Sequence, residues 1–337
     1  MPASNIHINT TDNPLDEQHF HKLKAGLTNS SGTAYTDFKK TLKPNFLVVW
    51  RDITIAWAGI ISVVFISWIL FRISNTVISL LLIIPAAAIL GYIMAGLVNF
   101  FHEAAHHNLS GNKKLNDLSA NLFIGILIGQ GIKNYRVVHW QHHIALGTTA
   151  DTERSYFESL NLRFFMLSLS GISAISFFIK RAAYVNGKQP EKASAVRPEK
   201  YFMLAAGLVF HALLLASFYL SGQYGLMAVW ILATGSFYPF FNRLRQLIEH
   251  RSENASPDSD YSMTDHGKTN RLFGNSIIAR TFGSAGFNRH LLHHLEPTVS
   301  YTRLNDLETF LKDTPLSVQL NKQQSTYYSI FKKLIGR

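Results

Sequence analysis

Four long apolar stretches dominate the pattern of this chain, and polar or charged stretches separate them. An α-helix needs about 20 predominantly apolar residues to cross a bilayer, and each stretch is close to that length. They occur as two pairs, each joined by a short polar turn. The pattern predicts two membrane-spanning hairpins, with spans at residues 53–71, 76–101, 201–220 and 225–241.

The rest of the chain is more polar. Apolar pieces at residues 118–132 and 164–179 are interrupted by small or amide residues, so interfacial or half-buried helices are expected there. The predicted fold is an all-α membrane protein with four transmembrane helices and a cytoplasmic helical cap. Residues 1–43 are expected to be a flexible or surface-lying polar arm, residues 44–310 the integral-membrane domain, and residues 311–337 a cytoplasmic tail.

Composition agrees with a membrane protein. Of the 337 residues, 47% are hydrophobic and only 16% are charged, against about 25% charged in a typical soluble domain. Lys and Arg exceed Asp and Glu by 32 to 21, and only Arg72 lies in a turn on the other side of the predicted spans. The positive-inside tendency therefore places both termini and the polar segments in the cytoplasm, and no nucleic-acid partner is predicted. With no cysteine, disulfides, thiolate metal sites and cysteine nucleophiles are excluded.

Three histidine clusters follow these apolar segments: FHEAAHH at 101–107, HWQHH at 139–143 and HLLHH at 290–294. Within each cluster, histidines three or four residues apart would share one helical face and could bind one metal. An even number of spans separates the clusters, so all three are expected on the cytoplasmic side. Eight donors are too many for one ion and suit two. The predicted ligands of this dinuclear site are His102, His106, His139, His142, His143, His290, His293 and His294.

Other polar residues have weaker assignments. The fourth span is expected to continue through NRLRQLIEH, which makes His250 a ninth ligand, and Gln246 is a candidate for binding a metal-linked water. His107 is expected outside the ligand set, and His211 as a polar contact within the bundle. The histidines predicted to be solvated are His7, His19, His21 and His266. The carboxylates predicted to orient ligating imidazoles are Glu103, Asp117, Asp151, Glu249 and Glu296.

Two simpler interpretations compete for these motifs. HEAAH alone fits a zinc protease helix, but that reading leaves six histidines in two similar clusters unexplained. The clusters could also belong to solvated helices beside the membrane. A third possibility is a membrane metal-binding or transport protein without redox chemistry.

HEAAH, HWQHH and HLLHH, set around four spans, resemble the three histidine boxes of the membrane-bound fatty acid desaturase superfamily. LGTTADTE at 146–153, RQLIEHR at 245–251 and FNRHLLHHLEPTVSYTRL at 287–304 are similar to segments of short, bacterial-type acyl desaturases. The resemblance covers roughly residues 41–310 and implies that the eight box histidines, with His250, hold two iron ions.

The resemblance also implies a reaction. An O2-dependent diiron enzyme would introduce a double bond into an acyl chain of a lipid, acyl-CoA or acyl-ACP. A hydroxylase or ketolase of the same superfamily, acting on alkanes, carotenoids or sphingolipids, is the alternative. A separate electron donor, ferredoxin or cytochrome b5-like, would act with its reductase, and zinc could replace iron in purified samples. The expected substrate tunnel is lined by Tyr135, Trp140 and Tyr156.

Overall fold

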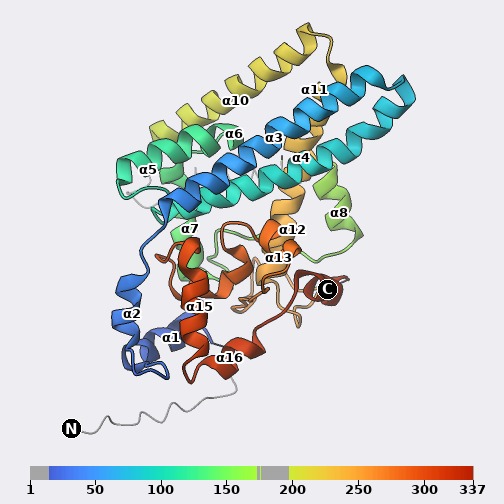
Figure 1. The fold of residues 1–337 in the computed structure, drawn as a ribbon. Helices are drawn as coiled ribbons and strands as arrows, with labels where there is room; N and C mark the ends of the chain where they lie inside the picture. Colours follow the sequence, from blue (N-terminus) through green and yellow to red (C-terminus); the bar gives the residue numbers. More distant parts are fainter. Residues whose placement is uncertain (1–14, 173–174, 176–196, 337) are drawn as a thin grey trace, which may run out of the picture.

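The computed structural model describes residues 15–172, 175 and 197–336, which fold into helices with isolated bridges as their only β pairing. Figure 1 shows a bundle of long helices above a cap of shorter ones. Four helices of the described chain are long and apolar enough to cross a membrane. They are α3 (Phe46–Ile73), α4 (Thr76–Ala105), α10 (Arg197–Leu220) and a composite helix, Tyr224–His250. The prediction of four spans is therefore confirmed.

The bundle helices begin at side-chain caps and continue past their apolar runs. Asn45 accepts a hydrogen bond from the Val48 backbone N–H at the start of α3, and Asn75 does the same for Ile78 in α4. The composite helix consists of α11 (Tyr224–Leu232), a π-helical segment (Ala233–Phe237) and α12 (Tyr238–His250). The cap ends of α4 and α12 meet the cap (Figure 1). Their last turns carry His102 and His250.

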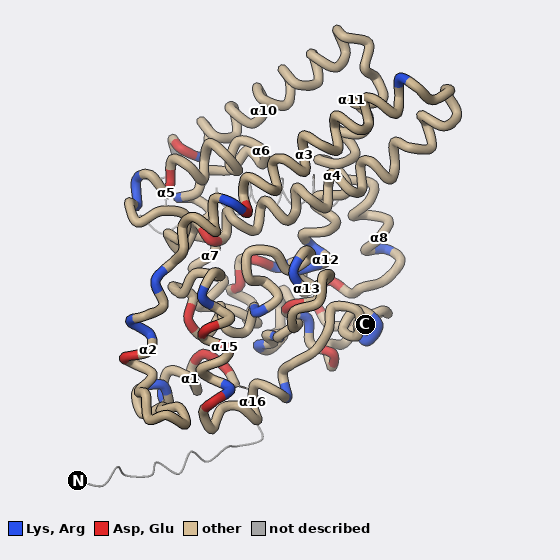
Figure 2. Tube along the Cα trace, viewed as in Figure 1, with Lys and Arg blue, Asp and Glu red and all other residues tan. Residues whose placement is uncertain are grey.

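Large apolar side chains on the outside of the bundle are exposed, as expected for a surface that faces lipid. Ile61 is 63% exposed, Leu81 70% and Leu213 67%. Figure 2 shows that charged residues gather in the cap and near the cap end of the bundle, whereas the bundle's far end is almost free of them. Together, the apolar surface and the charge distribution mark the bundle as the membrane-embedded layer.

The apolar piece at 118–132 forms most of the first arm, and the turn, of a bent helix pair. The first arm, from α5 (Lys113–Ala120) to α6 (Ile126–Ile128), meets α7 (Ile132–Ala145) at 85°. Gly129, with φ of +61°, makes the turn. The Leu127 carbonyl accepts from His211 Nε2 at 2.9 Å, so His211 is the polar bundle contact that the sequence predicts. The outer face of this arm stays exposed, which agrees with a half-buried helix.

The cap contains two apolar cores beneath the bundle. One core joins the N-terminal helices to the helices that follow the third histidine cluster, and the other surrounds the lower part of α12. The second apolar piece supplies α8 (Leu162–Leu169) to that core, and residues 173–174 and 176–179 of this piece lie outside the described residues. The further cap helices are α13 (Ile277–Phe282), α14 (His290–Leu295), α15 (Leu304–Lys312), α16 (Ser317–Lys322) and α17 (Tyr327–Leu334).

The N-terminal segment lies on the surface of the cap but is firmly packed. Its helices α1 (Glu17–Leu23) and α2 (Tyr35–Thr41) bury Phe20 and Tyr35 against the leucines of α14 and α15. The polar composition of residues 1–43 hides this packing, because a few well-spaced apolar side chains are enough to anchor a short helix. Residues 1–14 lie outside the described part of the chain.

Candidate metal centre

Four helices deliver the nine predicted ligands to one place in the cap. His102 lies in the last turn of α4, and His106 caps the end of that helix. The second cluster lies on α7, His250 is the last residue of α12, and the third cluster forms most of α14. All nine side chains are buried, with His106 the most exposed at 7%. Burial of so many imidazoles is costly unless their nitrogens find partners.

The nine histidines form two adjacent groups, and within each group the donor atoms lie within 4.8 Å of one another. The first group has five members: His102, His106, His139, His143 and His293. The second has four: His142, His250, His290 and His294. The structure thus brings together every ligand that the sequence predicts, in a division suited to two ions.

The division follows from helix geometry. Along an α-helix, residues i and i+4 differ by about 40° in direction, whereas residue i+3 points about 60° to the other side. On α7, His139 and His143 accordingly join the first group and His142 joins the second. On α14 the pattern is reversed, because His290 and His294 join the second group and His293 crosses to the first. Each of these helices therefore contributes histidines to both groups.

Distances between ring nitrogens fit metal coordination. His139 Nε2 lies 2.9 Å from His106 Nε2 and 3.0 Å from His143 Nε2. In the second group, His290 Nε2 lies 2.9 Å from His250 Nε2 and 3.1 Å from His294 Nε2. Two nitrogens bound to one ion at about 2.1 Å, at right angles to each other, would lie roughly 3.0 Å apart.

Two further observations favour a metal. Both ring nitrogens of His102 are buried and make no hydrogen bond, and a bound ion would supply the missing partner of one of them. Burial, reinforced by neighbouring imidazoles, lowers the pKa of His290, His293 and His294 well below its usual value. These rings are therefore neutral, which is the form that binds metal. The residues fit a pair of metal ions held by nitrogen alone.

Outer partners fix the orientation of several rings. His142 Nδ1 donates to the Asp151 carboxylate at 2.9 Å, and His139 Nδ1 donates to Glu153 at 3.1 Å. Burial would raise the pKa of Glu153, but the adjacent imidazoles of His142 and His139 more than offset it and hold that pKa well below its usual range. His250 Nδ1 donates to the Thr269 carbonyl at 3.0 Å. Each bond places the proton on Nδ1 and leaves Nε2 to face the centre.

Comparison with protein families agrees with this geometry. The family model for fatty acid desaturases matches residues 78–324, which is most of the chain and includes all nine histidines. The chain belongs to the fatty acid desaturase family. Comparison with curated proteins found no match. Together with its four apolar helices, membership makes this desaturase-family protein an integral membrane protein, and the family implies an oxidoreductase.

The carboxylates expected beside the ligands of this desaturase-family centre take other roles, except Asp151. Glu103 accepts from the Asn108 side chain and the Tyr301 backbone N–H, and it lies 3.8 Å from His102 Nδ1, beyond hydrogen-bond reach. Asp117 pairs with Arg136. These two carboxylates satisfy protein donors at the base of the bundle, where buried N–H groups need acceptors.

The other two are also engaged elsewhere. Glu249 binds Arg245 at 2.6 Å and accepts from Tyr327, so it is held 4.0 Å from His290. Glu296 accepts from Tyr35 and pairs with two lysines of the N-terminal segment. Basic or hydroxyl side chains from distant parts of the chain thus compete for these carboxylates, which sequence proximity cannot reveal.

The remaining polar candidates lie around the centre. Gln246 donates to Glu153, so in this structure it supports the carboxylate behind His139. His107 lies outside both groups, in the left-handed region with φ of +62°. His266, expected to be solvated, is buried at 9% exposure because its ring packs against Tyr156 and Tyr261, and its Nε2 accepts the Ser252 backbone N–H.

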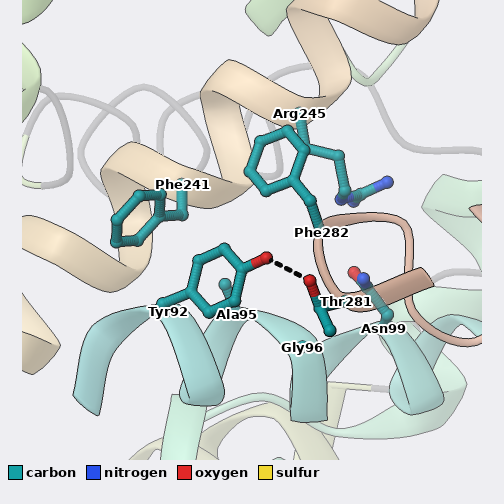
Figure 3. A pocket seen from close by; sticks show the side chains of 8 residues that line it. All are labelled: Tyr92, Ala95, Gly96, Asn99, Phe241, Arg245, Thr281 and Phe282. Atoms are coloured by element: carbon teal, nitrogen blue, oxygen red, sulfur yellow. Dashed lines mark hydrogen bonds between the residues drawn. The ribbon is translucent and has the colours of Figure 1, made fainter. Parts of the chain in front are cut away.

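The cavities differ from the expected aromatic tunnel. Figure 3 shows a pocket between α4, α12 and α13, in which the Tyr92 and Thr281 hydroxyls form a hydrogen bond of 2.7 Å. Its volume of about 10 Å³ holds roughly one water molecule. Tyr135 stacks on the His139 ring, and Tyr156 is fully buried, donating to Asp151. These two tyrosines therefore pack against histidines of the two groups, Tyr135 against His139 and Tyr156 against His250.

Trp140 has a different position, in a wide cleft of about 550 Å³ that is open to the surface of the cap. His143 and His294, one member of each histidine group, also line this cleft. Glu17 and Lys22 of α1 also line the cleft, and Glu17 lies directly beside His294. The cleft gives the desaturase-family centre an approach from the surface of the cap.

Proposed function

We propose that this protein is an O2-dependent diiron desaturase that introduces a double bond into the acyl chain of a lipid, acyl-CoA or acyl-ACP. The observation that carries the proposal is the paired arrangement of nine buried histidines, five in one group and four in the other, in a chain of the fatty acid desaturase family. All-nitrogen ligation suits non-haem iron. Bound iron would supply the activation of O2 needed to remove hydrogen from unactivated methylenes.

The protein's own groups would hold and shield this centre. Asp151 and Glu153 keep the Nδ1 protons of His142 and His139 in place, so the Nε2 lone pairs point inward. Burial of the nine rings excludes bulk water from most of the centre. The nine rings are carried by four helices, α4, α7, α12 and α14. Because each ring is attached to a packed helix, the two groups keep their positions relative to each other.

The electron balance implies a partner. Making one double bond with one O2 yields two waters, and it requires two electrons and two protons beyond the two hydrogens removed from the C–H bonds. The chain has no cysteine to ligate an iron–sulfur cluster. We therefore infer a separate donor, ferredoxin or cytochrome b5-like, with its reductase. The placement of Lys and Arg supports a cytoplasmic location for the cap and both termini, where such a donor would dock.

Products formed by cells that express the protein test the proposal directly. We expect new double bonds in acyl chains, lost when O2 is withheld, and about two iron ions per chain in protein purified with iron. Oxygenated alkanes, carotenoids or sphingolipids in place of unsaturated acyl chains would instead assign a hydroxylase or ketolase. Absence of any O2-dependent product from iron-loaded protein with a competent donor would refute redox function. Because zinc also binds imidazole, iron must be supplied before activity is judged.

Donor docking predicts a dependence on ionic strength. The chain has a net charge of +11, so an acidic donor should associate through complementary charge. Turnover with an acidic ferredoxin at limiting concentration is expected to fall several-fold as salt rises from about 0.05 to about 0.5 M, because the Debye length shortens. Single-turnover oxidation of chemically reduced protein is the control and should stay constant. A donor-driven rate that does not change with salt would rule out electrostatic docking.

A further inference from the structure

The N-terminal helix α1 reaches the histidine centre from outside the part of the chain that matches the desaturase family. The match begins at residue 78, whereas α1 covers Glu17–Leu23. Glu17 Oε1 accepts a hydrogen bond from His294 Nδ1 at 2.9 Å, and the Glu17 side chain is only 19% exposed. The other observed outer partners of the nine rings, Asp151, Glu153 and Thr269, lie within the matched region.

Helix α1 is anchored so that Glu17 cannot move freely. Phe20 is completely buried between α14 and α2, where its ring lies edge-on to that of Tyr35. The Leu15 backbone N–H donates to Gln323 Oε1 at 3.0 Å, and Gln323 Nε2 donates to the Leu15 carbonyl at 3.2 Å. Just after α1, Lys24 pairs with Glu296 at 2.9 Å. These contacts hold the start of α1 to the end of α16 and its end to the last residue of the segment that carries the third histidine cluster.

Glu17 contacts a histidine of the four-histidine group, so it can affect an ion bound by that group. His294 belongs to the four-histidine group, and its ring centroid lies 4.5 Å from that of His143 in the five-histidine group. Glu17 also borders the open cleft that these two histidines line. One carboxylate oxygen of Glu17 and one ring nitrogen from each of these two histidines lie within 4.8 Å of one another, so Glu17 is in direct reach of the centre.

We propose that Glu17 is a positioning residue for the metal ion of the four-histidine group. Its carboxylate holds the Nδ1 proton of His294 and thereby directs Nε2 toward the ion, while α1 covers the side of the centre that faces the cleft. The inference rests on the proposed diiron function, because it assumes that both groups bind metal. Loss of an outer partner of this kind commonly weakens metal binding by about 10- to 100-fold.

The test compares Glu17→Gln and Glu17→Asp with the unchanged protein, purified in detergent and loaded with ⁵⁷Fe(II). Glu17→Gln nearly preserves side-chain shape and should release one of the two irons at least about 10-fold faster to a chelator. In Mössbauer spectra, one of two iron signals should change and the other should stay. Glu17→Asp retains the charge and is expected to recover part of the lost affinity. Trypsin cleavage at Lys22 and Lys24 reports whether α1 remains docked.

Asp37→Asn is the matched control. It also removes a carboxylate from the N-terminal segment, but Asp37 is 67% exposed and pairs with Lys40. Iron release and spectra of Glu17→Gln equal to those of the unchanged protein would overturn the inference, as would iron loss shown equally by Asp37→Asn. Failure of the unchanged protein to bind two irons would refute the proposed diiron function instead, so the two failures are distinguishable.

Discussion

Replacing His143 by alanine is expected to abolish desaturation and to lower bound iron, while the protein still inserts into membranes. His143 Nε2 lies 3.0 Å from His139 Nε2 and 3.1 Å from His293 Nε2, so the substitution removes a central donor of the five-histidine group. The loss of activity should exceed the roughly 100-fold that removal of an outer partner costs. Iron per chain and product yield, measured on the same purified sample, check this expectation.

His107→Asn provides a control beside the same centre. His107 follows His106 directly but lies outside both groups, and asparagine tolerates the left-handed backbone found there. This variant should keep both irons and most of its activity. Normal iron content and product formation in His143→Ala would remove His143 from the ligand set, and equal losses in both variants would point to general disruption of the cap.

Much of this architecture can be predicted from the chain because its signals are local. The apolar runs are long enough to identify the four spans without any knowledge of packing. Histidines spaced at i, i+3 and i+4 must lie on adjacent helical directions, so each cluster is recognisable as a ligand set. His250 is also accessible to this reasoning, since the periodic pattern of NRLRQLIEH continues the fourth helix to that residue.

The division of ligands into five and four depends on the packing of α7 against α14. Helix geometry shows that His142 is rotated by about 60° from His139 and by about 100° from His143, but which group it joins depends on the position of α14. Glu17 and Glu153 show that the carboxylates that contact the histidines cannot be chosen from the sequence. Glu153 is near the second cluster in sequence, yet so are other carboxylates, and Glu17 lies 277 residues before the histidine that it contacts. Choosing among them requires the three-dimensional structure.

Asp151→Ala is expected to cause the largest loss among substitutions behind the ligands. The Asp151 carboxylate is completely buried and accepts from His142 Nδ1 at 2.9 Å, from the Tyr156 hydroxyl and from the Glu153 backbone N–H at 2.8 Å. Alanine would leave three donors without this acceptor, and each unsatisfied buried donor costs about 1–3 kcal/mol. The unfolding temperature should therefore fall, and iron should bind about 10- to 100-fold more weakly.

Asp151→Asn separates the two effects, because the asparagine carbonyl can still accept from His142 while the charge is lost. We expect it to fold more stably than Asp151→Ala but to bind iron less tightly than the unchanged protein. Asp258→Ala, which removes an exposed carboxylate of the cap, should change neither property. Thermal unfolding of metal-free protein measures the structural contribution, and iron titration of folded protein measures the contribution to the centre. Unaltered iron affinity in both Asp151 variants would show that His142 keeps its orientation without this carboxylate, and Asp151 would then support only the packing around Tyr156.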